Sequence, residues 1–126
     1  MSNPNQPLVL MLSDDLIFNS RVMGTAKDLG AIVRTARNAE TLLKLAGESA
    51  PACVIVDLAN SGLRIGEVAR DLKQLQPAPK VIAYGSHVDV AGLQAARDAG
   101  CDLVLPRSQF VANLPGDLAR WLEPTQ

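Results

Sequence analysis

Hydrophobic positions along the chain follow two alternating patterns. Five short runs, most of them apolar throughout, alternate with stretches in which apolar residues recur at helical spacing. The runs cover residues 8–12, 31–35, 53–57, 80–84 and 102–105. Continuous apolar runs of this length are typical of strands that are covered on both faces of a sheet. The alternation therefore predicts an α/β chain built on a parallel sheet.

The segments between these strands carry the helical pattern. Apolar residues recur at helical spacing over residues 18–29, 42–46, 68–75 and 90–99. Gly30 and Gly100 follow the first and the fourth segment, where a left-handed residue ends many helices. A first turn at Phe110 and Leu114 and then a last helix up to Leu122 are predicted after the fifth strand, which Pro106 is expected to end.

Length, charge and composition narrow the class of protein. The 126 residues suffice for one core, so we expect a single domain over 1–126 with its core at about 7–123. Twelve basic and thirteen acidic residues nearly cancel, and no basic cluster indicates nucleic-acid binding. No apolar run reaches the roughly 20 residues that span a bilayer, and the first residues lack a signal-peptide pattern. We expect a cytoplasmic protein with no membrane contact and with Cys53 and Cys101 as reduced, mostly buried thiols.

Three aspartates mark one edge of the predicted sheet. Asp14 and Asp15 follow the first strand, and Asp57 ends the third. In a flavodoxin-like sheet of order 2-1-3-4-5 these strands are neighbours, so the carboxylates converge where ligands bind. Mg2+ would relieve their mutual repulsion, and Arg107 after the fifth strand could reach the same place. The alternative is that Asp14 or Asp15 caps the first helix and Asp57 caps a turn.

The motifs at these positions resemble a known family. The order of elements, the DD pair after the first strand, VIVDL on the third and the AG before the fifth resemble the receiver domain of bacterial response regulators, the CheY-like domain. The resemblance covers nearly the whole chain. It implies a flavodoxin-like (βα)5 three-layer sandwich in which a Mg2+-assisted aspartate accepts a phosphoryl group from a histidine kinase or a phosphotransfer protein.

The resemblance assigns roles to individual residues. Asp57 matches the phosphoacceptor, and Mg2+ would bind Asp14, Asp57 and the backbone carbonyl of Ala59. Ser13 then stands at the family's first acidic position, with Asp15 as an additional acid. A slip of one residue would instead make Asp14 and Asp15 the acidic pair, and the sequence leaves this register open.

Several residues depart from the family pattern. Gly85 stands where the family has a threonine or serine that binds the phosphoryl oxygen, and Ser86, one residue later, could substitute for it or simply form a turn. Arg107 replaces the family's lysine and would neutralise the phosphoryl group. Val104 replaces the aromatic switch residue of the fifth strand. The family's coupling of hydroxyl to aromatic side chain therefore lacks both partners.

Three classes of function follow from these residues. The first is a phosphorylatable receiver, with output through the face of the fourth helix, fifth strand and fifth helix. The second is a pseudo-receiver that binds proteins without phosphorylation. The third is a phosphatase with Asp57 as nucleophile, which ranks low because no phosphate loop or catalytic motif accompanies it. His87, the single histidine, is interpreted as a loop residue, since an isolated histidine makes a poor metal site.

Overall fold

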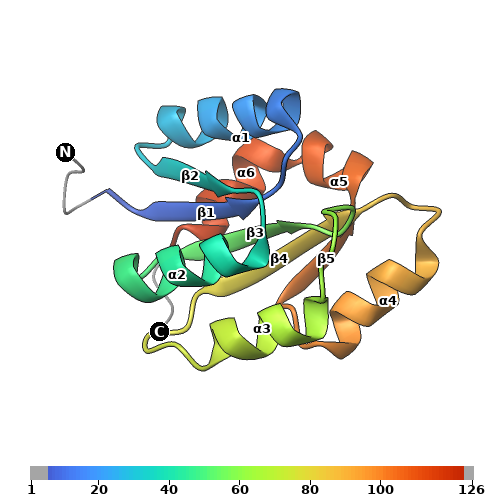
Figure 1. Ribbon diagram of the computed structural model, residues 1–126. Coiled ribbons are helices and arrows are strands. Elements are labelled where there is room, and N and C mark those ends of the chain that lie inside the picture. The colour runs from blue at the N-terminus through green and yellow to red at the C-terminus, as the bar shows by residue number, and fades with distance from the viewer. Residues whose placement is uncertain (1–5, 124–126) are drawn as a thin grey trace.

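The computed structural model describes residues 6–123, in which a parallel sheet lies between two layers of helices (Figure 1). Its strands are ordered β2-β1-β3-β4-β5, which confirms the predicted topology. They are β1 (Leu8–Leu12), β2 (Ile32–Ala36), β3 (Cys53–Asp57), β4 (Lys80–Gly85) and β5 (Leu103–Pro106). Strand β3 is buried along its whole length, as its unbroken apolar run predicts.

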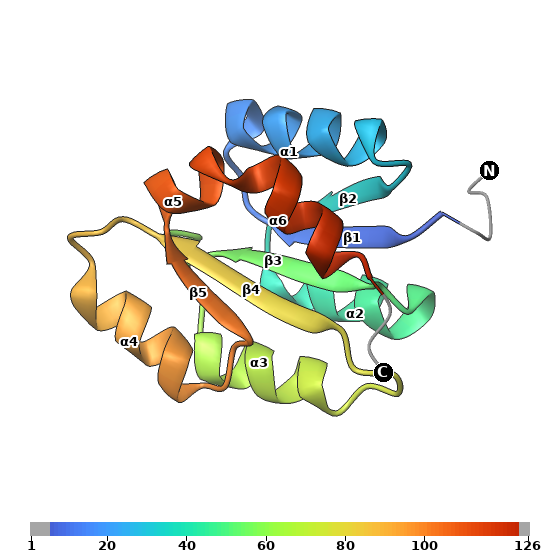
Figure 2. The same ribbon diagram turned by 180° about the vertical axis from the view of Figure 1, so that it is seen from behind.

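The helices are divided between the two faces of the sheet. They are α1 (Leu16–Asp28), α2 (Ala39–Ser49), α3 (Ile65–Lys73), α4 (Val90–Asp98), α5 (Arg107–Ala112) and α6 (Leu114–Trp121). Helices α1, α5 and α6 cover one face, and α2, α3 and α4 cover the other (Figures 1 and 2). Within residues 6–123, no helix combines the length and the apolar character needed to cross a bilayer.

Each face of the sheet has its own hydrophobic core, because successive strand residues point to opposite sides. On β3, Cys53 and Ile55 pack toward α1, α5 and α6, whereas Val54 and Val56 pack toward α2, α3 and α4. The first core also contains four aromatic residues, which are Phe18, Tyr84, Phe110 and Trp121. The alternation decides which residues at the strand ends face one another.

Two predictions about the last βα unit were wrong in detail. The fifth strand was predicted over residues 102–105 with Pro106 beyond its end, whereas β5 includes Pro106, which lies opposite Gly85 of β4. Proline is tolerated there because β5 is an edge strand and needs no further N–H donor. The segment that follows is not one turn and a helix but two helices, α5 and α6, which are separated at Asn113.

Candidate functional site

The candidate site lies at the carboxyl edge of the sheet, where β1, β3 and β4 end side by side. Asp57 pairs in register with Tyr84 of β4, and Ser13 follows Leu12, which pairs with Val56. The alternation of the strands directs Ser13, Asp57 and Tyr84 to the α1 side of the sheet. The three are nearly enclosed, with exposed fractions of 1%, 7% and 1%.

Asp57 takes part in a local turn. Its Oδ1 accepts a hydrogen bond of 2.9 Å from the backbone N–H of Ala59, and its carbonyl accepts one of 3.0 Å from the N–H of Asn60. An aspartate that bonds the amide two residues later is a common turn arrangement. The turn that the sequence offered as an alternative role for Asp57 is thus present. The residue nevertheless remains at the sheet edge, where ligands of this architecture bind.

The three polar residues after β1 have separate positions. Ser13 is buried, and its Oγ accepts from the N–H of Asp15 at 3.1 Å. Asp15 caps α1, because its Oδ1 accepts from the N–H of Phe18 at 3.0 Å. Asp14 lies between them and is exposed. The helix-cap role therefore falls to Asp15 and leaves Asp14 as an exposed acid at this edge.

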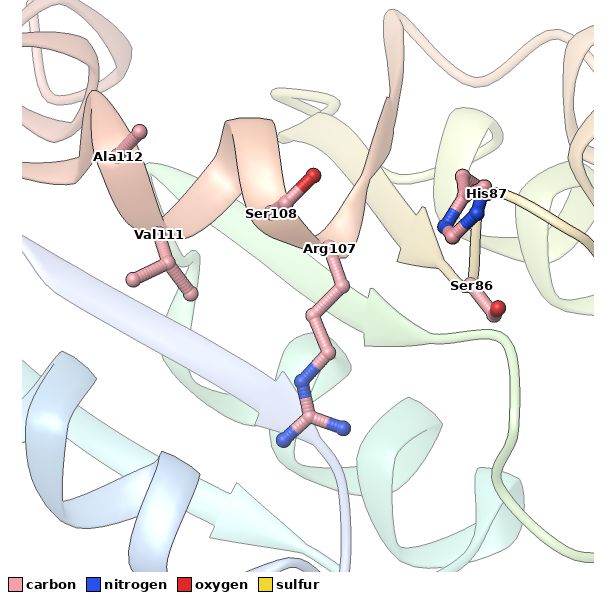
Figure 3. Close-up of a pocket in the computed structure, with 6 residues that line it drawn as sticks. All are labelled: Ser86, His87, Arg107, Ser108, Val111 and Ala112. Carbon is pink, nitrogen blue, oxygen red and sulfur yellow. The ribbon is translucent and has the colours of Figure 1, made fainter.

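Arg107, the first residue of α5, is held by partners on the α1 side. Its guanidinium forms an ion pair of 2.8 Å with Asp15 and lies 4.5 Å from the centre of the Phe18 ring. Figure 3 shows the side chain extending over the end of β1, away from Ser86 and His87. The Phe18 amide, and then Arg107, lower the pKa of the Asp15 carboxyl below its usual value. Within residues 6–123, no ion pair joins Arg107 to Asp57.

Tyr84 is the residue of this site that sequence reasoning missed. It was taken for one more apolar strand residue, although its place two residues after Ile82 puts it on the same face as Asp57. Its ring stacks on Phe110 at 4.8 Å and lies 4.9 Å from Phe18. Its hydroxyl is buried and has no hydrogen-bond partner in the described part of the chain. Burial, and next the charge of Asp57, raise the pKa of this hydroxyl.

Helix α5 separates two open pockets beside this edge. One, of about 670 Å³, is lined by Ser86, His87, Arg107, Ser108, Val111 and Ala112 (Figure 3). The other, of about 380 Å³, is lined by Asp15, Ile17, Phe18, Arg21, Arg107 and Val111. Arg107 and Val111 thus line both pockets, whereas Asp57 lines neither.

Comparison with known proteins identifies the fold. No family model matches the sequence, and no curated protein matches it. Solved structures do match: the receiver domain of NtrX from Brucella abortus is 23% identical, with a TM-score of 0.77, and the match covers 93% of this chain and 99% of that one. The response regulator CheY4 of Vibrio cholerae is 18% identical, with a TM-score of 0.78 and coverage of 94% and 100%. A response regulator from Thermotoga maritima is 17% identical, with a TM-score of 0.77 and coverage of 93% and 98%.

The chain has the receiver-domain fold. The predicted resemblance is confirmed at the level of the fold, with strands in the same order and helices on both faces. The receiver fold places Asp57 at the end of its third strand and Arg107 directly after its fifth. The predicted roles of these residues stay predictions, because likeness at this level of identity concerns the fold.

The residues that depart from the receiver pattern are accommodated by packing. A Cβ on Gly85 would lie 3.3 Å from Cδ1 of Leu58, so a side chain there needs Leu58 to move. Ser86 is exposed, and its Oγ accepts from the N–H of Val88 at 3.3 Å, which is the turn role that the sequence left open. Val104 is half-buried against the core on the α2, α3 and α4 side. In this arrangement neither Gly85 nor Ser86 presents a hydroxyl to Asp57.

The donor set for Mg2+ in this receiver fold is small. In residues 6–123, no group of three or more acidic, histidine or cysteine side chains is placed to hold a metal ion. Mg2+ commonly binds through one or two carboxylates and keeps several waters. The predicted donors, which are the carboxylates of Asp14 and Asp57 and the carbonyl of Ala59, therefore stay a prediction, and buried Ser13 would contribute no charge to such a site.

Proposed function

We propose that this chain is a receiver-type signalling domain that acts by binding other proteins and is not switched by phosphorylation. The observation that carries the proposal is the position of Arg107. This cation is bound to Asp15 and lies over Phe18, whereas a switch would need it at Asp57. Under this proposal the chain catalyses no reaction.

Charge and hydrogen bonding around Asp57 support the proposal. A phosphoryl group on Asp57 would add negative charge and three acceptor oxygens, which need cations and donors beside them. The Nη2 atom of Arg107 is bound to Asp15 and its guanidinium lies over Phe18, so this cation already has partners on the α1 side. Gly85 has no hydroxyl to donate, and the space beside it is filled by Leu58. Phosphorylation would therefore gain little stabilisation from this site.

The surface used for binding is proposed to be the α4, β5 and α5 face. Three large apolar side chains of this region are exposed to solvent: Val88 in the loop before α4, Val90 at the start of α4, and Leu103 at the start of edge strand β5. Exposed apolar residues of this kind mark protein contacts when they gather on one face. A downstream protein is the proposed partner of this face.

A second candidate function is that of a phosphorylatable receiver, which is favoured by two aspartates at the ends of neighbouring strands. Asp14 is exposed at the end of β1, and Asp57 ends the neighbouring strand β3. In this second mode, Asp14, Asp57 and the Ala59 carbonyl would hold Mg2+, which would shield the charge of an incoming phosphoryl group. Asp57 would then accept that group from a histidine kinase or a phosphotransfer protein, and Arg107 would turn toward it.

Intact mass after incubation with acetyl phosphate and Mg2+ tests the two candidates. We expect wild type to keep its mass, as Asp57→Ala does, and a competent receiver domain treated in parallel shows that the reagent works. Gain of one phosphoryl group in wild type that Asp57→Ala lacks would reject our first proposal and establish the second. The mass spectrum is recorded over a time course, so that a short-lived acyl phosphate is detected.

A further inference from the structure

Two buried side-chain atoms of the described residues, one on β4 and one on α1, form no hydrogen bond. In the described part of the chain, the Tyr84 hydroxyl and Oδ1 of Asn19 are the buried side-chain atoms that form no hydrogen bond. The Nδ2 of Asn19 donates to the carbonyl of Ser13 at 3.2 Å. Folded proteins pair nearly all buried polar groups, so an unpaired hydroxyl at a candidate site calls for an explanation.

The strand register places Tyr84 beside Asp57, and the charge of Asp57 acts on the Tyr84 hydroxyl. The two residues are direct partners in the β3–β4 register, and both side chains point to the α1 side of the sheet. Phe18 and Phe110 pack against the Tyr84 ring and restrict its movement. Within residues 6–123, the amide of Ala59 is the group that hydrogen-bonds the Asp57 carboxylate, through Oδ1. Oδ2 is left to accept another bond.

We propose that Tyr84 is a positioning residue whose hydroxyl donates to the Asp57 carboxylate and holds it in a metal-free, unphosphorylated state. A small rotation of the ring or one enclosed water completes this link. The inference rests on the proposed function, because it explains why Asp57 is retained in a domain without a phosphorylation switch. Tyr84 would stabilise the carboxylate charge that a bound cation stabilises in a working site.

A link of this kind competes with a metal. A carboxylate oxygen that accepts from a buried hydroxyl must give up that bond, or share the oxygen, before Mg2+ can coordinate it. A hydrogen bond to a charged group that is lost on binding weakens the affinity by about tenfold or more. Removing the hydroxyl while keeping the ring should therefore strengthen Mg2+ binding and preserve the aromatic packing.

The first test is a Mg2+ titration in which the NMR signal of the Ala59 backbone amide is the readout, since this N–H is bonded to Asp57. We expect Tyr84→Phe to bind Mg2+ about tenfold more tightly than wild type. Ser86→Ala is the matched control, because it removes an exposed hydroxyl at the same edge that is engaged in a turn. It should leave the affinity unchanged. An unchanged or weaker affinity in Tyr84→Phe overturns the proposal.

The second test needs no substitution of Tyr84. A buried hydroxyl proton exchanges slowly enough to be seen by NMR, and Tyr84 is the one tyrosine of the chain. Asp57→Asn replaces a charged acceptor by a neutral one, so the hydroxyl proton should shift upfield. Asp14→Asn, which changes an exposed carboxylate at the same edge, should not move it. An unmoved signal in Asp57→Asn overturns the link even if Tyr84→Phe were to fold poorly.

These outcomes are separate from that of the mass experiment. If wild type gains a phosphoryl group and Asp57→Asn still moves the hydroxyl signal, the proposed function fails but the Tyr84 link stands. If wild type keeps its mass and neither titration nor hydroxyl signal responds, the link fails and the pseudo-receiver stands.

Discussion

At the scale of single residues, Asp15 determines where the cation of the site lies. Its Oδ1 caps α1, and its Oδ2 binds Arg107 at 2.8 Å. A neutral cap would leave Arg107 without this partner, whereas a carboxylate holds it on the α1 side. Asp14, one residue earlier, is exposed and takes no part in this pair. Adjacent residues of the same type therefore have different consequences for the site.

The effect of Arg107 on Asp15 can be measured directly. The folded-state pKa of Asp15 is lowered, first by the Phe18 amide and then by Arg107, so the carboxylate stabilises the fold above its unfolded pKa of about 3.9. That contribution is lost as the pH falls through the folded pKa. Arg107→Ala should raise the folded pKa only part of the way to its usual value and so narrow this pH window.

The measurement is an NMR pH titration of the Asp15 carboxyl carbon in wild type and Arg107→Ala. Arg21→Ala is the control, because Arg21 lines the same pocket and forms no ion pair within residues 6–123. An equal change in both variants, or none in Arg107→Ala, would contradict the assignment of this interaction.

Sequence reasoning found the residues of the site but not their partners. The ends of apolar runs placed Ser13, Asp57 and Gly85 at one edge, because strand ends are a local property of the pattern. The pairing of Arg107 with Asp15 joins positions 92 residues apart and depends on the side chain leaving α5 toward α1. The Tyr84 hydroxyl was missed because its apolar ring fits a buried strand as well as phenylalanine would.

At the scale of elements, Asp102 connects α3, β4 and β5. Its Oδ2 accepts from the backbone N–H of Val81 at 2.7 Å, and both its oxygens lie within 2.9 Å of the Lys73 ammonium. Val81 belongs to a central strand and is fully buried. The sequence predicted that the fifth strand begins at Asp102, but β5 begins at Leu103. This side-chain bond explains the difference, because the Asp102 carboxylate bonds the β4 backbone itself.

Substitutions of Asp102 and of Lys73 should lower the free energy of unfolding by different amounts. Asp102→Ala leaves a buried N–H without an acceptor and should lower the free energy of unfolding by about 1–3 kcal/mol. Lys73→Ala removes a half-exposed ion pair and should lower it by at most about 1 kcal/mol. Urea unfolding of both variants provides the comparison. Equal losses, or a larger loss in Lys73→Ala, would show that the ion pair and not the backbone bond matters.

The fold was predictable to the extent that its elements are marked by local patterns. Five apolar runs became five parallel strands, and the strand order followed from the βα alternation. Residues 107–112 were predicted to form a turn rather than the helix α5, because Phe110 is the one buried residue in this short segment. Pro115, in the first turn of α6, has no N–H to bond the carbonyl of Val111, so one continuous helix cannot run through.

At the scale of the whole molecule, the two cores differ in how far they shield the two cysteines. Cys53 lies on the central strand β3 and is fully buried, whereas Cys101 precedes β5 and is half-buried. Burial raises the pKa of the Cys53 thiol to about 12 and also raises that of Cys101. Both thiols are free, as predicted, but burial is complete for only one of them.

Alkylation of Cys53 should therefore report on opening of the whole sheet. The thiolate is the reactive form, and the folded state offers neither access nor ionisation at Cys53. In a Cys101→Ala background, the rate of iodoacetamide labelling should rise with urea in parallel with global unfolding. In a Cys53→Ala background, Cys101 should react at a rate that depends weakly on urea. Fast labelling of Cys53 in native buffer would contradict the predicted protection of this thiol in the folded state.

The aromatic core has an optical consequence. The chain has one tyrosine and one tryptophan, and the Phe110 ring stacks on both, with its centre 4.8 Å from that of Tyr84 and 5.7 Å from that of Trp121. At such short range, excitation energy absorbed by Tyr84 passes to Trp121 before it can be emitted. The folded protein should fluoresce as a pure tryptophan emitter, and tyrosine emission should return when Trp121 on α6 separates from β4. The protein thus carries its own donor and acceptor for following the docking of its last helix.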